Sequence, residues 1–294
     1  MLIQTEQQLR KYLPNAFSTV EGEVSLFDKL QPYLAEAEVW LRSSITGKDM
    51  LLLLAAADDE ETAKGEASRA VTCDALMHAI PSLDVVLTPN GFGVVSNQNV
   101  APASKDRVQR LMNSMEQQRD DAVTHLLKLI RGQKAWQQSP VFNLWCRTLF
   151  PDIGVVSQLG VTEHQFAKYL ELIPRIIHVE TSLAAEFISP ELLEHLHTYQ
   201  FFKYEASQSA ERGIGYDKLS PLEQSGRAYV ITHLRAEIVA ELQGLPMNRQ
   251  YMTDLVQFIR SSPEVFPQWH ASATAELFSP PVFENKKDAQ GYFF

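Results

Sequence analysis

Two pairs of oppositely charged residues stand at matching places in the sequence. Glu38 and Arg69 lie in the first half, and Glu180 and Arg227 lie in the second. A carboxylate and a guanidinium on neighbouring helices can form a bidentate ion pair that fixes how the helices pack, and the same two groups can instead grip a ligand. We predict one Glu–Arg ion pair in each half, and we interpret both pairs as structural.

The histidines offer weaker chemistry. His233 and Glu237 are four residues apart, so they share a helix face and could ligate a metal, whereas His195 and His197 are two apart and point to different faces. Neither set has a third ligand nearby in the sequence. The chain also lacks the HExxH, Walker A, GxSxG and GxGxxG motifs. We therefore expect no catalytic residues, no metal site and no cofactor.

The composition excludes several classes of partner. The chain has 294 residues, of which 45% are hydrophobic and 21% charged, as in an ordinary globular protein, and its net charge is −10. An acidic surface does not displace counterions from phosphate and is repelled by anionic lipid, so we expect neither nucleic acid nor membrane as a partner. The sequence has no signal peptide pattern and only two cysteines, which predicts a chain that is cytoplasmic at synthesis.

The elements that would position these residues recur as an internal repeat. The segment Thr5–Leu13 matches Thr162–Leu170 at six of nine positions, and both open with a capping box, Thr-x-x-Gln. Further matches follow in the same order: Glu38 with Glu180, Ile45–Gly47 with Ile188–Pro190, Arg69 with Arg227, Thr124–Arg131 with Thr253–Arg260, and Trp145 with Trp269. The order of these matches predicts two diverged copies of one helical bundle.

The spacing between matches gives the domain boundaries. We expect a first helical repeat over residues 1–150, a second over 151–277, and an extended tail over 278–294. The first repeat contains a long amphipathic helix, because apolar residues from Val108 to Ile130 recur at intervals of three and four after a capping residue, Ser104. The fold class is therefore mostly α.

The first copy carries an insertion of different character at about 84–96. Two apolar segments, Asp84–Leu87 and Phe92–Val95, flank Thr88-Pro89-Asn90-Gly91, and this pattern is typical of a β-hairpin. A lone hairpin is marginal in water, so it must pack on the helices or pair with another strand.

We name Asn90, Gly91 and Phe92 of this insertion as candidate protein contacts. An amide-rich connection follows it, in which Asn97 and Asn99 are further candidates; the same connection can simply lead into the long helix.

The insertion also carries a resemblance. The segment Leu87–Lys105, which contains Gly91-Phe92-Gly93-Val94-Val95-Ser96-Asn97-Gln98-Asn99-Val100-Ala101-Pro102-Ala103-Ser104, resembles an uncharacterised family found in gut anaerobes and their phages and prophages. Members of that family look like phage structural genes of the head–tail connector or tail-assembly kind. The resemblance implies a component of a virion or prophage particle and no catalytic residue.

The expected function is therefore that of a non-enzymatic structural or adaptor protein, present in the cytoplasm at synthesis and then in a virion. Its partners would be copies of itself, as in a homo-oligomeric ring, or phage structural proteins. The alternative is an intracellular small-molecule-binding protein or enzyme that uses a cleft between the two repeats.

Overall fold

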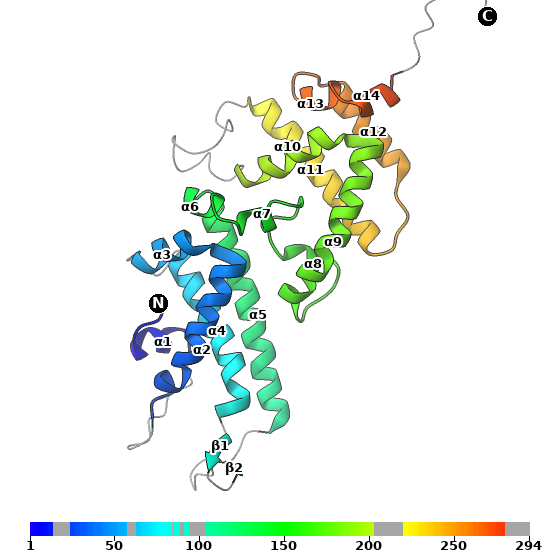
Figure 1. Ribbon diagram of the computed structural model, residues 1–294. Helices are drawn as coiled ribbons and strands as arrows, with labels where there is room; N and C mark the ends of the chain where they lie inside the picture. The colour runs from blue at the N-terminus through cyan, green and yellow to red at the C-terminus, as the bar shows by residue number, and fades with distance from the viewer. Residues whose placement is uncertain are drawn as a thin grey trace, which may run out of the picture. The chain divides into compact units, whose positions relative to one another are not determined.

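The computed structural model describes residues 1–13, 24–57, 63–83, 85–88, 91–94, 104–202 and 220–279. Over these ranges the chain is helical apart from two short strands, so the mostly α class is confirmed (Figure 1). No helix in the described part is long and apolar enough to cross a membrane.

The chain divides into two compact units. Unit 1 comprises Met1–Ile176 and the segment that begins at His197, and unit 2 comprises Ile177–Leu196 and the chain from Leu219. The division falls inside a continuous helix, not between residues 150 and 151 as the repeat spacing suggested. The tail expected at 278–294 lies outside the described residues from position 280 onward.

Unit 1 is built from helices, a short π-helical segment and one strand pair. Its elements are α1 (Glu6–Tyr12), α2 (Leu26–Leu41), η1 (Arg42–Thr46), α3 (Lys48–Ala56), α4 (Ala63–Leu83), β1 (Val85–Thr88), β2 (Gly91–Val94), α5 (Lys105–Ile130), α6 (Lys134–Gln137), α7 (Phe142–Trp145), α8 (Gly154–Gln158) and the first part of α9 (Gln165–Leu183). Helix α5 is the long amphipathic helix that the apolar spacing predicted, with Ser104 at its N-cap.

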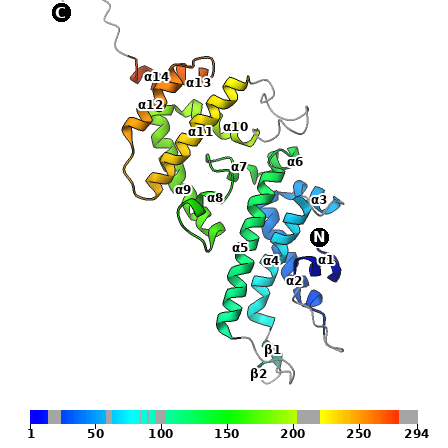
Figure 2. The same cartoon turned by 180° about the vertical axis from the view of Figure 1, so that it is seen from behind.

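The centre of unit 1 is α4, which packs against α2 on one side and α5 on the other (Figures 1 and 2). Its buried positions hold mostly small side chains, which let the two neighbouring helices approach closely. They include Ala67, Ala70, Val71, Cys73, Ala75 and Ala79. Because α4 is covered on more than one side, it lacks the single apolar stripe that identifies a surface helix.

The strands β1 and β2 form an antiparallel pair between α4 and α5. Their register runs from Val85 opposite Val94 to Thr88 opposite Gly91. Among the described residues this pair joins no further strand, so it adds no sheet layer to the all-α architecture.

Unit 2 is a smaller helical bundle. It contains the end of α9, η2 (Ala184–Ile188), the start of α10 (Pro190–Phe202), α11 (Pro221–Leu242), α12 (Arg249–Arg260), α13 (Pro267–His270) and α14 (Ala273–Leu277). Helix α11 begins with the capping box of Ser220 and Glu223, and its buried residues, such as Val230, Leu234 and Ile238, line the core.

The same local geometry occurs in both units, where a long helix turns into a shorter one. The amide that follows each π-helical segment donates to the carbonyl five residues earlier, from Gly47 to Arg42 at 2.9 Å and from Ser189 to Ala184 at 2.8 Å. Gly47 has a φ of 74° and Ser189 a φ of 76°. Such wide turns leave a carbonyl free.

A buried tryptophan satisfies that carbonyl in each unit. The Nε1 of Trp136 donates to Ile45 at 2.7 Å, and the Nε1 of Trp269 donates to Phe187 at 2.8 Å. The sequence match paired Trp145 with Trp269, but the residue of unit 1 that makes the equivalent hydrogen bond is Trp136. Trp145 instead donates to the carbonyl of Ser44 and stacks on Tyr169.

The two predicted capping boxes have different outcomes. Thr5 accepts from the amide of Gln8 and completes the box at the start of α1. Thr162 does not begin a helix. Helix α9 starts at Gln165, and the residue before it, His164, has a φ of 53°. The reason lies in contacts from α5 that hold His164 and its neighbours, described below.

A Cβ on Gly47 would meet both backbone strain and a clash. The added atom would lie 2.6 Å from the Cβ of Ser139, and a left-handed backbone itself costs an L residue about 1–2 kcal/mol. We expect Gly47→Ala to lower the free energy of unfolding by about 2–5 kcal/mol, since overpacking adds about 1–3 kcal/mol. Urea denaturation followed by tryptophan fluorescence measures the loss.

Gly160→Ala is the matched control. Gly160 has a φ of 77°, but nothing lies within 4 Å of its added Cβ. It should therefore lose only the backbone part, about 1–2 kcal/mol. Equal losses in the two variants would contradict the tight packing of η1 on Ser139.

Candidate functional site

The predicted ion pair between Glu38 and Arg69 is not formed. Glu38 on α2 instead accepts from the backbone amide of Leu2. Arg69 on α4 lies 3.7 Å from Glu66, one turn earlier on its own helix. Leu2 and Ile3 are buried in the core, and this burial brings the N-terminal backbone to Glu38.

In unit 2, Glu180 on α9 and Arg227 on α11 are both buried, with 2% and 4% of their surface exposed. Arg227 Nη2 donates to the carbonyl of Val265 at 3.4 Å. Their pairing with each other stays a prediction.

The residues of the first histidine set have structural partners. His233 Nδ1 lies 2.8 Å from the carbonyl of Tyr229, and Glu237 accepts from the amide of Asn248 at 2.8 Å. Burial lowers the pKa of His195 to about 4, and the charge of Arg227 acts in the same direction. No group of three potential metal ligands occurs in the part of the chain that the structure describes.

The candidate contacts of the insertion are only partly placed. Gly91 is the first residue of β2, and Phe92 stands opposite Leu87 in the register. Asn90, Asn97 and Asn99 lie outside the described residues.

A different set of charged side chains comes together in unit 1, centred on Arg119 of α5. Its guanidinium bonds Asp74 Oδ1 of α4 at 3.1 Å and Asp120 Oδ1 at 2.9 Å, and it lies 3.5 Å from Glu116. These four residues are the Arg119 cluster. Exposed fractions of 11% for the Arg119 side chain, 6% for Asp74 and 1% for Asp120 show that the charges are shielded from water.

Side chains of α5 also hold the start of α9. Asp120 Oδ2 accepts from the amide of Phe166 at 3.0 Å. Glu116 bonds His164 Nδ1 at 2.9 Å, and Asn113 donates to Glu163 at 3.2 Å. The first turn of α9 is therefore capped by another helix, which replaces the local box expected at Thr162.

An aromatic contact extends the cluster to α2. The guanidinium carbon of Arg119 lies 5.5 Å from the ring centroid of Trp40, within reach of a cation–π attraction. Trp40 also makes an edge contact with Phe166, with 5.5 Å between ring centroids. One arginine thus contacts groups from α2 and α4 and, through Asp120, reaches α9.

Burial and charge act against each other in this cluster. Burial raises the pKa of the Asp120 carboxyl, while Arg119 and the amide of Phe166 oppose that shift. Burial alone would lower the pKa of Arg119, but Asp120 and Asp74 outweigh it and raise that pKa. Arg119 therefore stays charged, as a buried guanidinium with carboxylate partners should.

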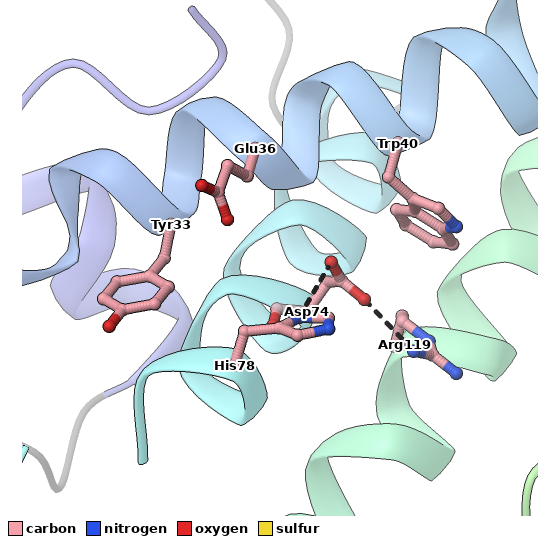
Figure 3. A pocket seen from close by; sticks show the side chains of 6 residues that line it. All are labelled: Tyr33, Glu36, Trp40, Asp74, His78 and Arg119. Carbon is pink, nitrogen blue, oxygen red and sulfur yellow. Dashed lines mark hydrogen bonds and ion pairs between the residues drawn. The ribbon is translucent and has the colours of Figure 1, made fainter. Parts of the chain in front are cut away.

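Beside the cluster is a hollow of about 380 Å³ lined by Tyr33, Glu36, Trp40, Asp74, His78 and Arg119 (Figure 3). The first three residues lie on one face of α2 at intervals of three and four. Asp74 and His78 come from α4, and Arg119 closes one end. The hollow combines two carboxylates with two aromatic rings inside unit 1.

The sequence predictions missed these residues, although a signal was present. Arg119 and Asp120 interrupt the apolar stripe of α5 between Met115 and Ala122. Asp74 likewise stands among buried apolar residues of α4. Charged residues on a buried helix face predict paired buried charges, but not which partners they find.

Comparison with known proteins finds a family match for part of the chain. A model of a family of unknown function (DUF6712) matches residues 20–143, a range that contains α2 to α6 and all the candidate contacts at the insertion. No curated protein and no solved structure matches the chain.

Removal of the Arg119 charge should strongly destabilise unit 1. Arg119→Met leaves Asp74 and Asp120 buried without their cation, so we expect a loss of about 3–5 kcal/mol in the free energy of unfolding. Arg10→Met is the control, because Arg10 makes an exposed pair with Glu6 and should cost less than about 1 kcal/mol. Urea denaturation measures the free energy of unfolding of both variants. Equal losses would contradict the structural role of the cluster.

The contact between His164 and Glu116 should depend on pH. Hydrogen bonding to Glu116 and its charge raise the pKa of His164, with a smaller effect from Glu163 and an opposing one from burial and Arg119. A raised folded-state pKa means that the contact contributes stability below the ordinary histidine pKa of about 6.5 and loses it as pH rises through the folded pKa. NMR titration of the His164 ring measures this pKa directly.

Two variants separate the causes. Glu116→Gln should return the His164 pKa toward its ordinary value, whereas Glu163→Gln should move it less. An unchanged titration of His164 in Glu116→Gln would show that the hydrogen bond does not form in solution.

Proposed function

We propose that this chain is a non-enzymatic structural or adaptor protein of a phage or prophage particle, of the head–tail connector or tail-assembly type. The resemblance of Leu87–Lys105 to phage-associated proteins supports the proposal. The match to a family of unknown function over residues 20–143 includes that segment and is compatible with it. The chain would be synthesised in the cytoplasm and would then act as a subunit of a virion.

The proposal includes a duplicated scaffold. From Pro32 to Leu54 and from Pro174 to Leu196, equivalent residues differ in number by 142 throughout. The sequence match of Ile45–Gly47 with Ile188–Pro190 is therefore wrong by one residue, because Gly47 corresponds to Ser189. Both segments carry a proline inside the first helix, the same π-helical turn and the same tryptophan contact. Helix α3 of unit 1 therefore corresponds to the start of α10.

The observation that carries the proposal is an apolar surface on α3. Leu52 and Leu53 are 59% and 55% exposed, although Met50 and Leu54 of the same helix are buried. A helix that is apolar on all sides is normally covered on all sides. We infer that Leu52 and Leu53 are covered by another subunit.

The corresponding positions of α10 make the inference stronger. There Leu192 and Leu196 are buried like Met50 and Leu54, but Glu194 and His195 stand where α3 has its two exposed leucines. The scaffold therefore does not require leucine at these positions. Their presence in α3 is better explained by a contact.

We assign this contact to a second copy of the chain. A ring forms when one surface meets a different surface of the next copy and the rotation closes. The strand pair β1–β2 and the tail from residue 278 are the other surfaces offered for such a contact. The net charge of −10 favours an apolar contact over a charged one between identical copies.

The second candidate is a small-molecule-binding protein. The hollow beside the Arg119 cluster favours it, because it holds carboxylates and aromatic rings in one concave place. A catalytic role has no comparable support.

Exchange of the α3 leucines for the residues of α10 tests the assembly. Leu52→Glu with Leu53→His should leave the fold intact and shift the protein from oligomer to monomer, because the apolar contact area is lost. Mass photometry and electron microscopy of the purified full chain measure the oligomer distribution across concentrations. The unfolding midpoint should stay within the range usual for surface substitutions.

Leu222→Glu is the matched control, since Leu222 is 63% exposed in the other unit and should keep the assembly. A wild-type chain that stays monomeric at all concentrations, alone and with phage structural proteins, would overturn the proposal. An oligomer unaffected by the double substitution would overturn the role of α3.

A further inference from the structure

We propose that the hollow between α2, α4 and α5 binds an organic cation, a guanidinium or alkylammonium group. The site does not depend on the proposed function. It lies beside the Arg119 cluster and shares Asp74 and Arg119 with it.

The first observation concerns Asp74, which forms the floor of the hollow. The residue is 4% exposed, and Oδ1 is occupied by Arg119 at 3.1 Å. Oδ2 lies 3.4 Å from His78 Nδ1, but that nitrogen makes its shorter contact, at 2.9 Å, with the Asp74 carbonyl. The contact between Oδ2 and His78 is thus an ion pair only when the imidazole is protonated, and the Asp74 carboxylate lines the hollow.

Glu36 supplies a second negative charge. It is exposed on α2, and Figure 3 shows its carboxylate directed toward the space between Tyr33 and Asp74. No hydrogen bond or ion pair holds this carboxylate within the part of the chain described. The one permanent cation that lines the hollow, Arg119, is also paired with Asp120, and His78 adds a positive charge only when it is protonated. With the carboxylates of Glu36 and Asp74, the negative charge therefore prevails, and the hollow attracts a positive ligand and repels an anion.

Aromatic rings determine which kind of cation fits. Tyr33 and Trp40 line the hollow, and the Tyr33 hydroxyl is fixed by Ser82 at 2.5 Å. Aromatic faces attract guanidinium and ammonium groups, as the position of Arg119 beside Trp40 already illustrates. A divalent metal prefers several oxygen ligands, and no group of three potential ligands is present among the described residues.

The volume fixes the size of the ligand. About 380 Å³ is at the small end for ligand pockets and admits one side-chain-sized group. The cation can come from two sources, a free small amine or the arginine or lysine side chain of a protein partner. Both present the same chemistry to Asp74 and Glu36.

Titration with defined probes tests the site in the full chain. Ethylguanidinium and butylammonium should shift the Trp40 indole N–H resonance in a saturable way, whereas the uncharged isostere N-ethylacetamide should not. Glu36→Gln should weaken binding about tenfold, and Tyr33→Leu should weaken it as well. Glu171→Gln, a change at an exposed carboxylate elsewhere in unit 1, should leave binding unchanged.

Asp74→Asn should abolish binding, but it also removes a partner of Arg119 and can unfold the chain. Glu36→Gln and Tyr33→Leu avoid this difficulty, because neither residue belongs to the Arg119 cluster. No saturable shift with either cation, an equal shift with N-ethylacetamide, or preferential binding of Mg²⁺ would each overturn the proposal. So would unchanged affinity in both of these variants.

A last comparison identifies the source. The peptide acetyl-Ala-Arg-Ala-amide should bind at least as tightly as ethylguanidinium if the site takes a partner's side chain. Weaker binding of the peptide would assign the site to a free small cation. Either result supports recognition of an organic cation.

Discussion

The helices of unit 1 depend on one buried charge. A guanidinium cannot be neutralised in a protein, so wherever α5 buries Arg119 the surrounding helices must supply carboxylates. Asp74 of α4 and Asp120 of α5 do so, and the second oxygen of Asp120 then caps α9. Because these contacts are directional, they fix the rotation of α4 against α5 more strictly than the small apolar side chains between them could.

The turns at η1 and η2 show a second constraint, this time of the backbone. A π-helical turn ends in a conformation that favours glycine, and it leaves a carbonyl for a tryptophan to satisfy. Unit 1 uses Gly47, where a side chain would meet Ser139. Unit 2 uses Ser189, whose hydroxyl accepts from the amide of Leu192 at the start of α10 and so offsets part of the strain.

Such constraints separate residues that the scaffold needs from residues that it does not. The Arg119 cluster, the two tryptophans and Gly47 have structural partners that account for them. Leu52, Leu53 and Glu36 do not, and the proposals for a subunit contact and a cation site depend on these residues. The two surfaces differ in chemistry, one apolar and convex on a helix, the other acidic and concave, so they suit different ligands.

The sequence by itself determined the helical class, the long helix α5 and the Thr5 capping box, because apolar periodicity and capping are local properties of consecutive residues. It also indicated that charged residues would pair, but not with which partner. Only the tertiary structure decided that Glu38 meets the amide of Leu2, that Arg119 gathers Asp74 and Asp120, and that α5 caps α9 in place of Thr162. These choices depend on distances between segments far apart in the chain, and a charged side chain has no local signal for which of several opposite charges the packing will bring near.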